Sequence, residues 1–208
     1  MKRKMDHSKI IQKFGDHYLA DENTFKMGID YRFTTPIAER FKNKIVLETC
    51  TGAGFSTLAL ARRAKRVITV EINRHHQDQA RKNIDRAGLN DKVEFKIADI
   101  LDKRLLSKLP PMDAAFLDPD WAVLRPNHIF KFINSNTQPP ADKLFETIFK
   151  ITHNIALILP PQIDTGEFKA LPGHERQKLY LDNNHELFCL YFGELALSYG
   201  ETELRINN

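Results

Sequence analysis

Gly52 and Gly54 form a glycine pair that Glu48 precedes by four residues, in the stretch ETCTGAG. Glycine lets a backbone approach a ligand closely where a strand ends and a helix begins. Thr57 replaces the third glycine of a dinucleotide-binding pattern, and the Glu48 carboxylate would repel a pyrophosphate but attract an ammonium group. The stretch therefore predicts a loop that binds S-adenosylmethionine through its ammonium, with a ligand-free glycine turn as the alternative.

Two further carboxylates follow the next two predicted strands. Glu71 lies about 20 residues beyond the glycine loop, where its carboxylate can accept hydrogen bonds from both ribose hydroxyls; a solvated acid is the alternative. Asp99 can accept a hydrogen bond from the adenine amino group while Ile100 packs on the purine face. Capping a helix is the alternative role for Asp99. With Glu48, these residues predict the anchors of the cofactor.

A fourth group, Asp118-Pro119-Asp120-Trp121, has the residue types that hold a base for methylation. Methylating an exocyclic amine requires its lone pair to be aimed at the methyl sulfonium. Asp118 can accept an amine hydrogen, a backbone carbonyl held by Pro119 can accept another, and Trp121 can stack on the base. We therefore predict Asp118, Pro119 and Trp121 as the catalytic group, with a core role as the alternative for Trp121.

The elements that must position these residues alternate between strands and helices. Apolar runs predict strands at 44–49, 66–70, 93–97, 114–117, 155–159, 186–192 and 202–206, and helices at 56–64, 75–87 and 144–152. Such alternation predicts right-handed βαβ units and a mainly parallel sheet with helices on both faces. The predicted fold class is therefore α/β and Rossmann-like, and the candidate residues follow the carboxyl ends of strands.

The two ends of the chain carry separate expectations. A glycine-containing loop joins the last two predicted strands, which we expect to form an antiparallel edge pair. The first 40 residues show no strand pattern and are expected to form a helical extension that covers the active site. The predicted domains are therefore this extension, 1–40, and a methyltransferase domain, 41–208.

Composition limits the classes of protein that the chain can belong to. It has 208 residues, 42% hydrophobic and 28% charged, which is ordinary for a soluble domain. No apolar run reaches the roughly 20 residues that span a bilayer, and MKRKMDHSK has no apolar run behind it, so we expect neither a membrane partner nor a secretory signal. Cys50, Cys189 and His75-His76 lack metal-ligand spacing. No metal is expected, and a reduced cytoplasm is the expected location.

The net charge of +4 mildly favours a polyanionic partner such as RNA. The basic run Arg62-Arg63-Ala64-Lys65-Arg66 is interpreted as a solvated helix end, with RNA contact as the alternative. The oligomeric state is left open.

Taken together, ETCTGAG, VEI, ADI and DPDW resemble the motifs of class I S-adenosylmethionine-dependent methyltransferases. Upstream, the stretches Lys13-Phe14, Tyr18, Gly28-Ile29-Asp30 and Thr35-Pro36-Ile37-Ala38-Glu39 resemble the amino-terminal segment of the RNA cap guanine-N2 methyltransferase family, the trimethylguanosine synthase-like proteins. The resemblance covers residues 13 to 121. It implies a seven-stranded sheet, an amino-terminal segment folded over cofactor and substrate, and a place for Thr35 near the methionine end of the cofactor.

The family holds its guanine with an S-P-P-W motif, from which this chain departs. Asp120 replaces the second proline, and Ala122-Val123 replaces the glycines that follow the tryptophan. The leading hypothesis is methyl transfer to the exocyclic N2 amine of a guanine in RNA, in tRNA or rRNA rather than a capped small RNA. One alternative is a methyltransferase for a small molecule or protein, with an apolar pocket roofed by 124–140. Another is a catalytically silent module that binds the cofactor or RNA.

Overall fold

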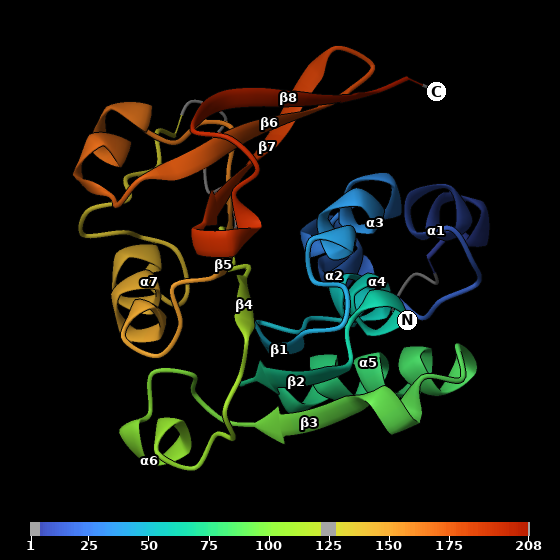
Figure 1. The fold of residues 1–208 in the computed structure, drawn as a ribbon. Coiled ribbons are helices and arrows are strands. Elements are labelled where there is room, and N and C mark those ends of the chain that lie inside the picture. Colours follow the sequence, from blue (N-terminus) through green and yellow to red (C-terminus); the bar gives the residue numbers. More distant parts are fainter. Residues whose placement is uncertain (1–4, 122–127, 208) are drawn as a thin grey trace. The chain divides into compact units, whose positions relative to one another are not determined.

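The computed structural model describes residues 5–121 and 128–207, which form two compact units, up to Met112 and from Asp113 onward (Figure 1). Ala122, Val123 and the first part of the predicted roof, 124–127, lie outside the described residues. The domain boundary at residue 40 stays a prediction. In the part of the chain that is described, no helix is long and apolar enough to cross a membrane.

The first unit contains three parallel strands in the order β3-β2-β1 (Figure 1). They are β1 (Ile45–Thr49), β2 (Arg66–Glu71) and β3 (Val93–Ile97). Nearly every residue of β1 and β2 is buried, as expected for parallel strands whose apolar runs are covered on both faces. Because the strands are parallel, their carboxyl ends share one edge, where Glu71 of β2 is paired with Ile97 of β3.

Helices connect these strands as the alternating pattern predicts. α4 (Phe55–Arg63) joins β1 to β2, and α5 (Arg74–Arg86) with the short 3₁₀ helix η1 (Asn90–Lys92) joins β2 to β3. The Asn73 side chain caps α5 by accepting hydrogen bonds from the first free N–H groups of the helix. The short helix α6 (Lys103–Leu106) follows β3.

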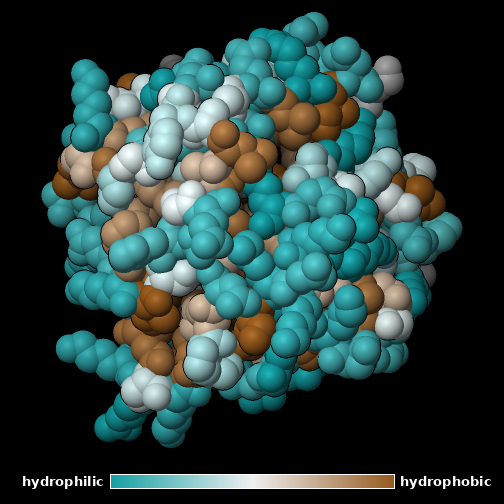
Figure 2. All heavy atoms as spheres, viewed as in Figure 1, coloured by the Kyte–Doolittle hydropathy of each residue, from teal (hydrophilic) through white to brown (hydrophobic). Residues whose placement is uncertain are grey.

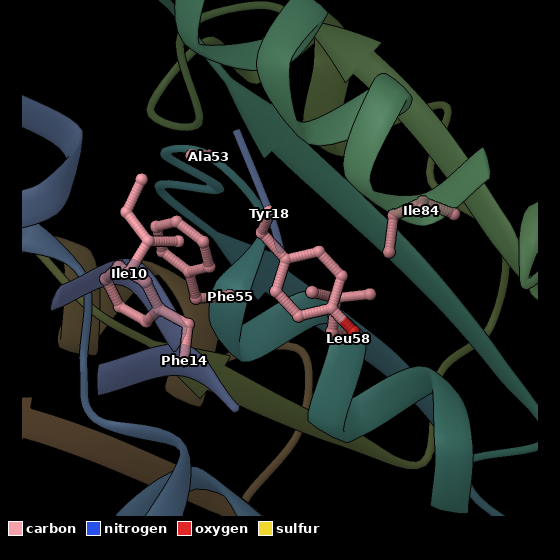
Figure 3. Close-up of a cluster of buried hydrophobic side chains, with 7 residues drawn as sticks. All are labelled: Ile10, Phe14, Tyr18, Ala53, Phe55, Leu58 and Ile84. Carbon is pink, nitrogen blue, oxygen red and sulfur yellow. The ribbon is translucent and has the colours of Figure 1, made fainter. Parts of the chain in front are cut away.

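Three short helices precede β1, so the helical character expected of the amino-terminal segment is confirmed. They are α1 (His7–Phe14), α2 (Glu22–Met27) and α3 (Tyr31–Glu39). The rings of Phe14 in α1 and Phe55 in α4 are stacked, with centroids 3.4 Å apart. Figure 3 shows these rings in a cluster with Ile10, Tyr18, Ala53, Leu58 and Ile84. This buried cluster attaches the amino-terminal segment to α4, α5 and the glycine loop.

The second unit holds five strands and one α-helix among its described residues. The strands are β4 (Ala114–Leu117), β5 (Ile155–Leu159), β6 (His174–Leu181), β7 (Asn184–Phe192) and β8 (Gly200–Ile206), in the order β4-β5-β7-β6-β8. α7 (Ala141–Phe149) packs on β4, and the 3₁₀ helices η2 (Thr165–Ala170) and η3 (Gly193–Leu195) lie in connections. β4 and β5 are parallel, whereas β7 is antiparallel to β5.

The expected antiparallel edge pair at the carboxyl end is wrong. β7 pairs with β5 and β6, while β8 pairs in parallel with β6. The described residues thus hold eight strands rather than the expected seven, and the additional strand is β6. Its sequence, HERQKLYL, is mostly polar and half-buried, so it lacks the apolar run by which the other strands of the sheet are recognised.

The surface in Figure 2 is largely hydrophilic, as expected for a chain with 28% charged residues. Figure 2 shows hydrophilic residues over most of the face in view, with apolar residues in scattered groups between them. Isolated apolar residues on a surface are ordinary and do not by themselves indicate a binding site.

Candidate functional site

Backbone geometry explains why the loop after β1 is rich in small residues. Cys50, Gly52 and Gly54 all have positive φ, at 61°, 54° and 82°. A Cβ on Gly54 would lie 3.0 Å from the Cβ of Ala80, so this glycine allows close packing against α5, whereas a Cβ on Gly52 would meet no atom within 4 Å. Gly54 is needed for packing inside the unit, and Gly52 leaves open space beside the backbone at the start of α4.

Glu48 lies near the end of β1 and is buried, with 1% of its surface exposed. The Thr57 hydroxyl donates a hydrogen bond to its Oε2 at 2.6 Å. Burial raises the pKa of the Glu48 carboxyl from 4.5 to about 7; the charge of Glu71 adds to the rise, and hydrogen bonds from Thr57 and Thr69 oppose it. No ion pair joins Glu48 to a basic side chain within the described residues. A ligand ammonium would supply the missing counter-charge.

Glu71 is the last residue of β2, and its carboxylate accepts hydrogen bonds from two backbone N–H groups. The Gly52 N–H donates to Oε2 at 2.9 Å, and the Asn73 N–H donates to Oε1 at 2.8 Å. Each carboxylate oxygen can accept more than one hydrogen bond, so both keep capacity for ribose hydroxyls. Glu71, the residue predicted to bind the ribose, therefore lies directly against the glycine loop.

Asp99 follows β3 at the same edge and is exposed. It does not cap α6, because Asp102 occupies the N-cap position and accepts from the Arg104 N–H. Instead, Asp99 accepts a hydrogen bond from the Leu101 N–H at 2.9 Å, within a tight turn that contains the buried Ile100. In this arrangement the Asp99 carboxylate could accept a hydrogen bond from the edge of an adenine, while the Ile100 side chain could pack on its face.

The structure gives Thr35 a different setting from the other predicted cofactor residues. It lies exposed on α3, whereas its neighbour Thr34 is buried. Within the described residues, no hydrogen bond joins Thr35 to Glu48 or Glu71. Its place near the methionine end stays a prediction from the family resemblance.

Two side chains that stabilise the site, those of Thr57 and Asn83, could not be identified from the sequence pattern. Thr57 replaces a glycine of the dinucleotide-binding pattern, and its hydroxyl is the hydrogen-bond donor to Glu48. Asn83 is fully buried on α5 and donates to the carbonyls of Leu19 and Ala53, while its Oδ1 accepts from the Leu19 N–H at 2.7 Å. The available signal was the placement of Asn83 beside Ile84, on the apolar face of α5.

The Asp118-Pro119-Asp120-Trp121 motif stands directly after β4 in the second unit. The backbone of Asp120 exchanges two hydrogen bonds with Gln138, each 2.8 Å long. Trp121 is half-buried and lies edge-to-face with Phe130, at 6.5 Å between ring centroids and 80° between planes. The buried Phe130 supports the indole from one side, so the motif is held by two independent contacts.

The model of the family described as RNA cap guanine-N2 methyltransferase matches residues 43–193, which is most of the chain. The chain belongs to the RNA cap guanine-N2 methyltransferase family. The predicted class I fold and its cofactor, S-adenosylmethionine, are thereby confirmed. The match contains the glycine loop and the Asp118 motif.

The relatives of this chain include proteins named as catechol O-methyltransferases. Catechol O-methyltransferases of Niastella koreensis and Mycobacterium tuberculosis are each 38% identical to it, over 95 and 92 residues. Each alignment covers 43% of this chain, with 43% and 42% of the two relatives. The chain thus spans less than half the length of the relatives that it matches.

Several solved structures have a fold similar to that of this chain. A protein of Porphyromonas gingivalis W83 assigned as a methyltransferase has a TM-score of 0.72 and 17% identity, covering 89% of this chain and 47% of that chain. TrmK of M. capricolum, solved with S-adenosyl-homocysteine, has a TM-score of 0.57 and 11% identity, covering 83% and 70%. At these identities the likeness concerns the fold alone.

Proposed function

We propose that this chain transfers a methyl group from S-adenosylmethionine to the exocyclic N2 amine of a guanine in RNA. The observation that carries the proposal is the Asp118-Pro119-Asp120-Trp121 motif, which follows β4 inside the stretch matched by the guanine-N2 methyltransferase family. An acceptor, a proline-held carbonyl and an aromatic face are the groups that an exocyclic amine on a flat base requires.

The first unit supplies the proposed cofactor contacts. Glu48, whose buried carboxyl has no basic partner among the described residues, would pair with the methionine ammonium. Glu71 would accept from the ribose hydroxyls, and Asp99 from the adenine amino group, with Ile100 against the purine. Gly52, beside which a Cβ would meet nothing, leaves room for the ligand along the backbone.

The second unit supplies the proposed base contacts. Held by the residues of the first unit, S-adenosylmethionine would supply an electrophilic methyl on a sulfonium, and sulfur would keep the bonding electrons as the guanine N2 lone pair forms the new bond. Asp118 accepts an N2 hydrogen and favours the positive charge that develops on nitrogen. Trp121 stacks on the guanine and fixes its plane. The surplus N2 proton leaves to solvent after transfer, so Asp118 need not be a strong base.

A transfer assay tests the proposal directly. The protein is incubated with radiolabelled S-adenosylmethionine and total RNA, which is then digested to nucleosides. We expect label in N2-methylguanosine. Label found only in a small-molecule or protein fraction would rule out the RNA reaction, and cofactor binding without any transfer would favour a silent binding module.

The relatives favour a second candidate function, O-methylation of a small aromatic substrate. Two of them, named as catechol O-methyltransferases, share 38% identity with this chain over their aligned residues. The same assay with catechol in place of RNA distinguishes the two functions. Transfer to catechol with none to RNA would make the second candidate correct.

A further inference from the structure

Basic side chains gather at the edge of the first unit where its strands begin. Lys42 lies three residues before β1, Lys65 directly precedes β2, and Lys92 directly precedes β3. Because β1, β2 and β3 are parallel, their amino ends share one edge. The glycine loop follows the carboxyl end of β1, so these lysines stand at the opposite edge from it.

A hollow of about 440 Å³ lies among these side chains. Its lining includes the three lysines, together with Arg62 and Arg63 from the carboxyl end of α4. Two neutral residues complete the lining, and no acidic residue belongs to it within the described part of the chain. Five basic side chains from three separate segments, 42–43, 62–65 and 92, therefore surround one space.

Most of this charge is not neutralised inside the protein. Arg63 forms an ion pair with Glu39, with 2.6 Å between Nε and Oε1. Arg62 donates to the neutral Tyr18 hydroxyl at 2.9 Å, and Lys92 Nζ lies 3.5 Å from a backbone carbonyl oxygen. Within the described residues, only Arg63 of the five is paired with a carboxylate.

The helix dipole accounts for part of this arrangement only. Cations in the last turn of α4 are stabilised by the carbonyl groups at its end, which explains Arg62 and Arg63. Lys65 directly follows the C-cap of this helix, whereas Lys42 and Lys92 come from other segments. Like charges around one hollow repel each other. An anionic ligand would offset that repulsion.

We propose that this basic hollow, formed by Lys42, Arg62, Arg63, Lys65 and Lys92, binds phosphate groups of the RNA backbone. The inference rests on the proposed function, because it takes the methylated RNA as the ligand. α4 has nine residues and connects the glycine loop to the hollow, a length of roughly 13 Å at 1.5 Å per residue.

Salt dependence of RNA binding tests the inference in the full chain. The variant Lys42→Gln/Lys65→Gln removes two exposed charges of the basic hollow whose side chains form no hydrogen bond or ion pair within the described residues. Binding of a fluorescent guanine-containing single-stranded RNA is measured by anisotropy at several KCl concentrations. We expect affinity at low salt to fall roughly 10-fold or more, and the slope of log Kobs against log[KCl] to shrink by about 1.4, from about 0.7 per lost contact.

Lys82→Gln/Lys108→Gln is the matched control, because it removes the same charge from exposed positions of the same unit outside the basic hollow. Its salt slope should equal that of the unaltered protein. Equal salt slopes in all three proteins, or equal losses of RNA affinity in both variants, would overturn the inference. So would a variant that loses affinity for phosphatidylserine vesicles but not for RNA. Hollow-dependent RNA binding without methyl transfer to guanine would instead overturn the proposed function alone.

Discussion

At the scale of single residues, the Glu48 carboxyl is an ionisable group buried where its charged form is unfavourable. Burial raises its pKa to about 7, above the 4.5 of an exposed glutamate. The folded state therefore binds the proton more tightly than the unfolded state does. The resulting stabilisation is complete below about pH 4.5 and is lost as the pH rises towards 7.

Replacing Glu48 tests this pH dependence. The shift corresponds to about 3 kcal/mol of unfolding free energy lost between pH 4.5 and 8. In Glu48→Gln, which can still accept from Thr57, this loss should disappear. Urea unfolding across that range measures it, with the exposed Glu186→Gln as control. Identical pH profiles for Glu48→Gln and the unaltered protein would contradict the assignment.

Trp121 is the residue that we expect to contact the base without contacting the cofactor. Stacking on an aromatic side chain contributes about 1–3 kcal/mol per base, so Trp121→Ala should weaken RNA binding roughly 10- to 100-fold. Titration calorimetry with S-adenosylmethionine should show unchanged affinity. Tyr199→Ala, which removes a mostly exposed ring of the same unit, is the control. Loss of cofactor binding in Trp121→Ala would show that its role is misplaced.

At the scale of elements, Asn83 connects the amino-terminal segment, α5 and the glycine loop through one buried amide. Asn83→Ala would leave the Leu19 N–H and the carbonyls of Leu19 and Ala53 without their partner. We expect a loss of about 2–4 kcal/mol in unfolding free energy and weaker cofactor binding. Asn90→Ala, an exposed asparagine, should change the midpoint of urea unfolding little. A similar midpoint for both variants would refute the structural role of Asn83.

Elements with a periodic or apolar pattern could be predicted from the sequence, and the others could not. β1, β2 and β5 are buried apolar runs, and glycine marks the loop after β1. β6 escaped prediction because its polar sequence is stabilised by pairing with β7 and β8 rather than by its own hydrophobicity. Without β6, the order of the last strands could not be predicted either.

The residues of the candidate site also divide into those that the sequence could predict and those that it could not. Glu71 and Asp99 could be assigned to one edge because parallel topology alone brings the ends of β2 and β3 together. Asn83 could not be found, since its partners Leu19 and Ala53 are 64 and 30 residues away in the sequence. Contacts of that range depend on packing that a local pattern does not contain.

At the scale of the whole molecule, family membership determines the cofactor, while the substrate depends on one motif. The family match covers residues 43–193, but relatives named for catechol methylation align with the chain as well. Asp120, in place of a proline, is the difference from the family that bears most directly on the substrate.

The position of the transferred methyl group tests the central claim most directly. RNA is incubated with the protein and deuteriomethyl-labelled S-adenosylmethionine, digested, and analysed by chromatography and mass spectrometry against the positional isomers of methylguanosine. The predicted product is N2-methylguanosine, and Asp118→Ala, with cofactor binding retained, should form little of it. Deuteriomethyl found at N1 or N7 of guanine, on another base, or only on catechol would contradict the proposed function.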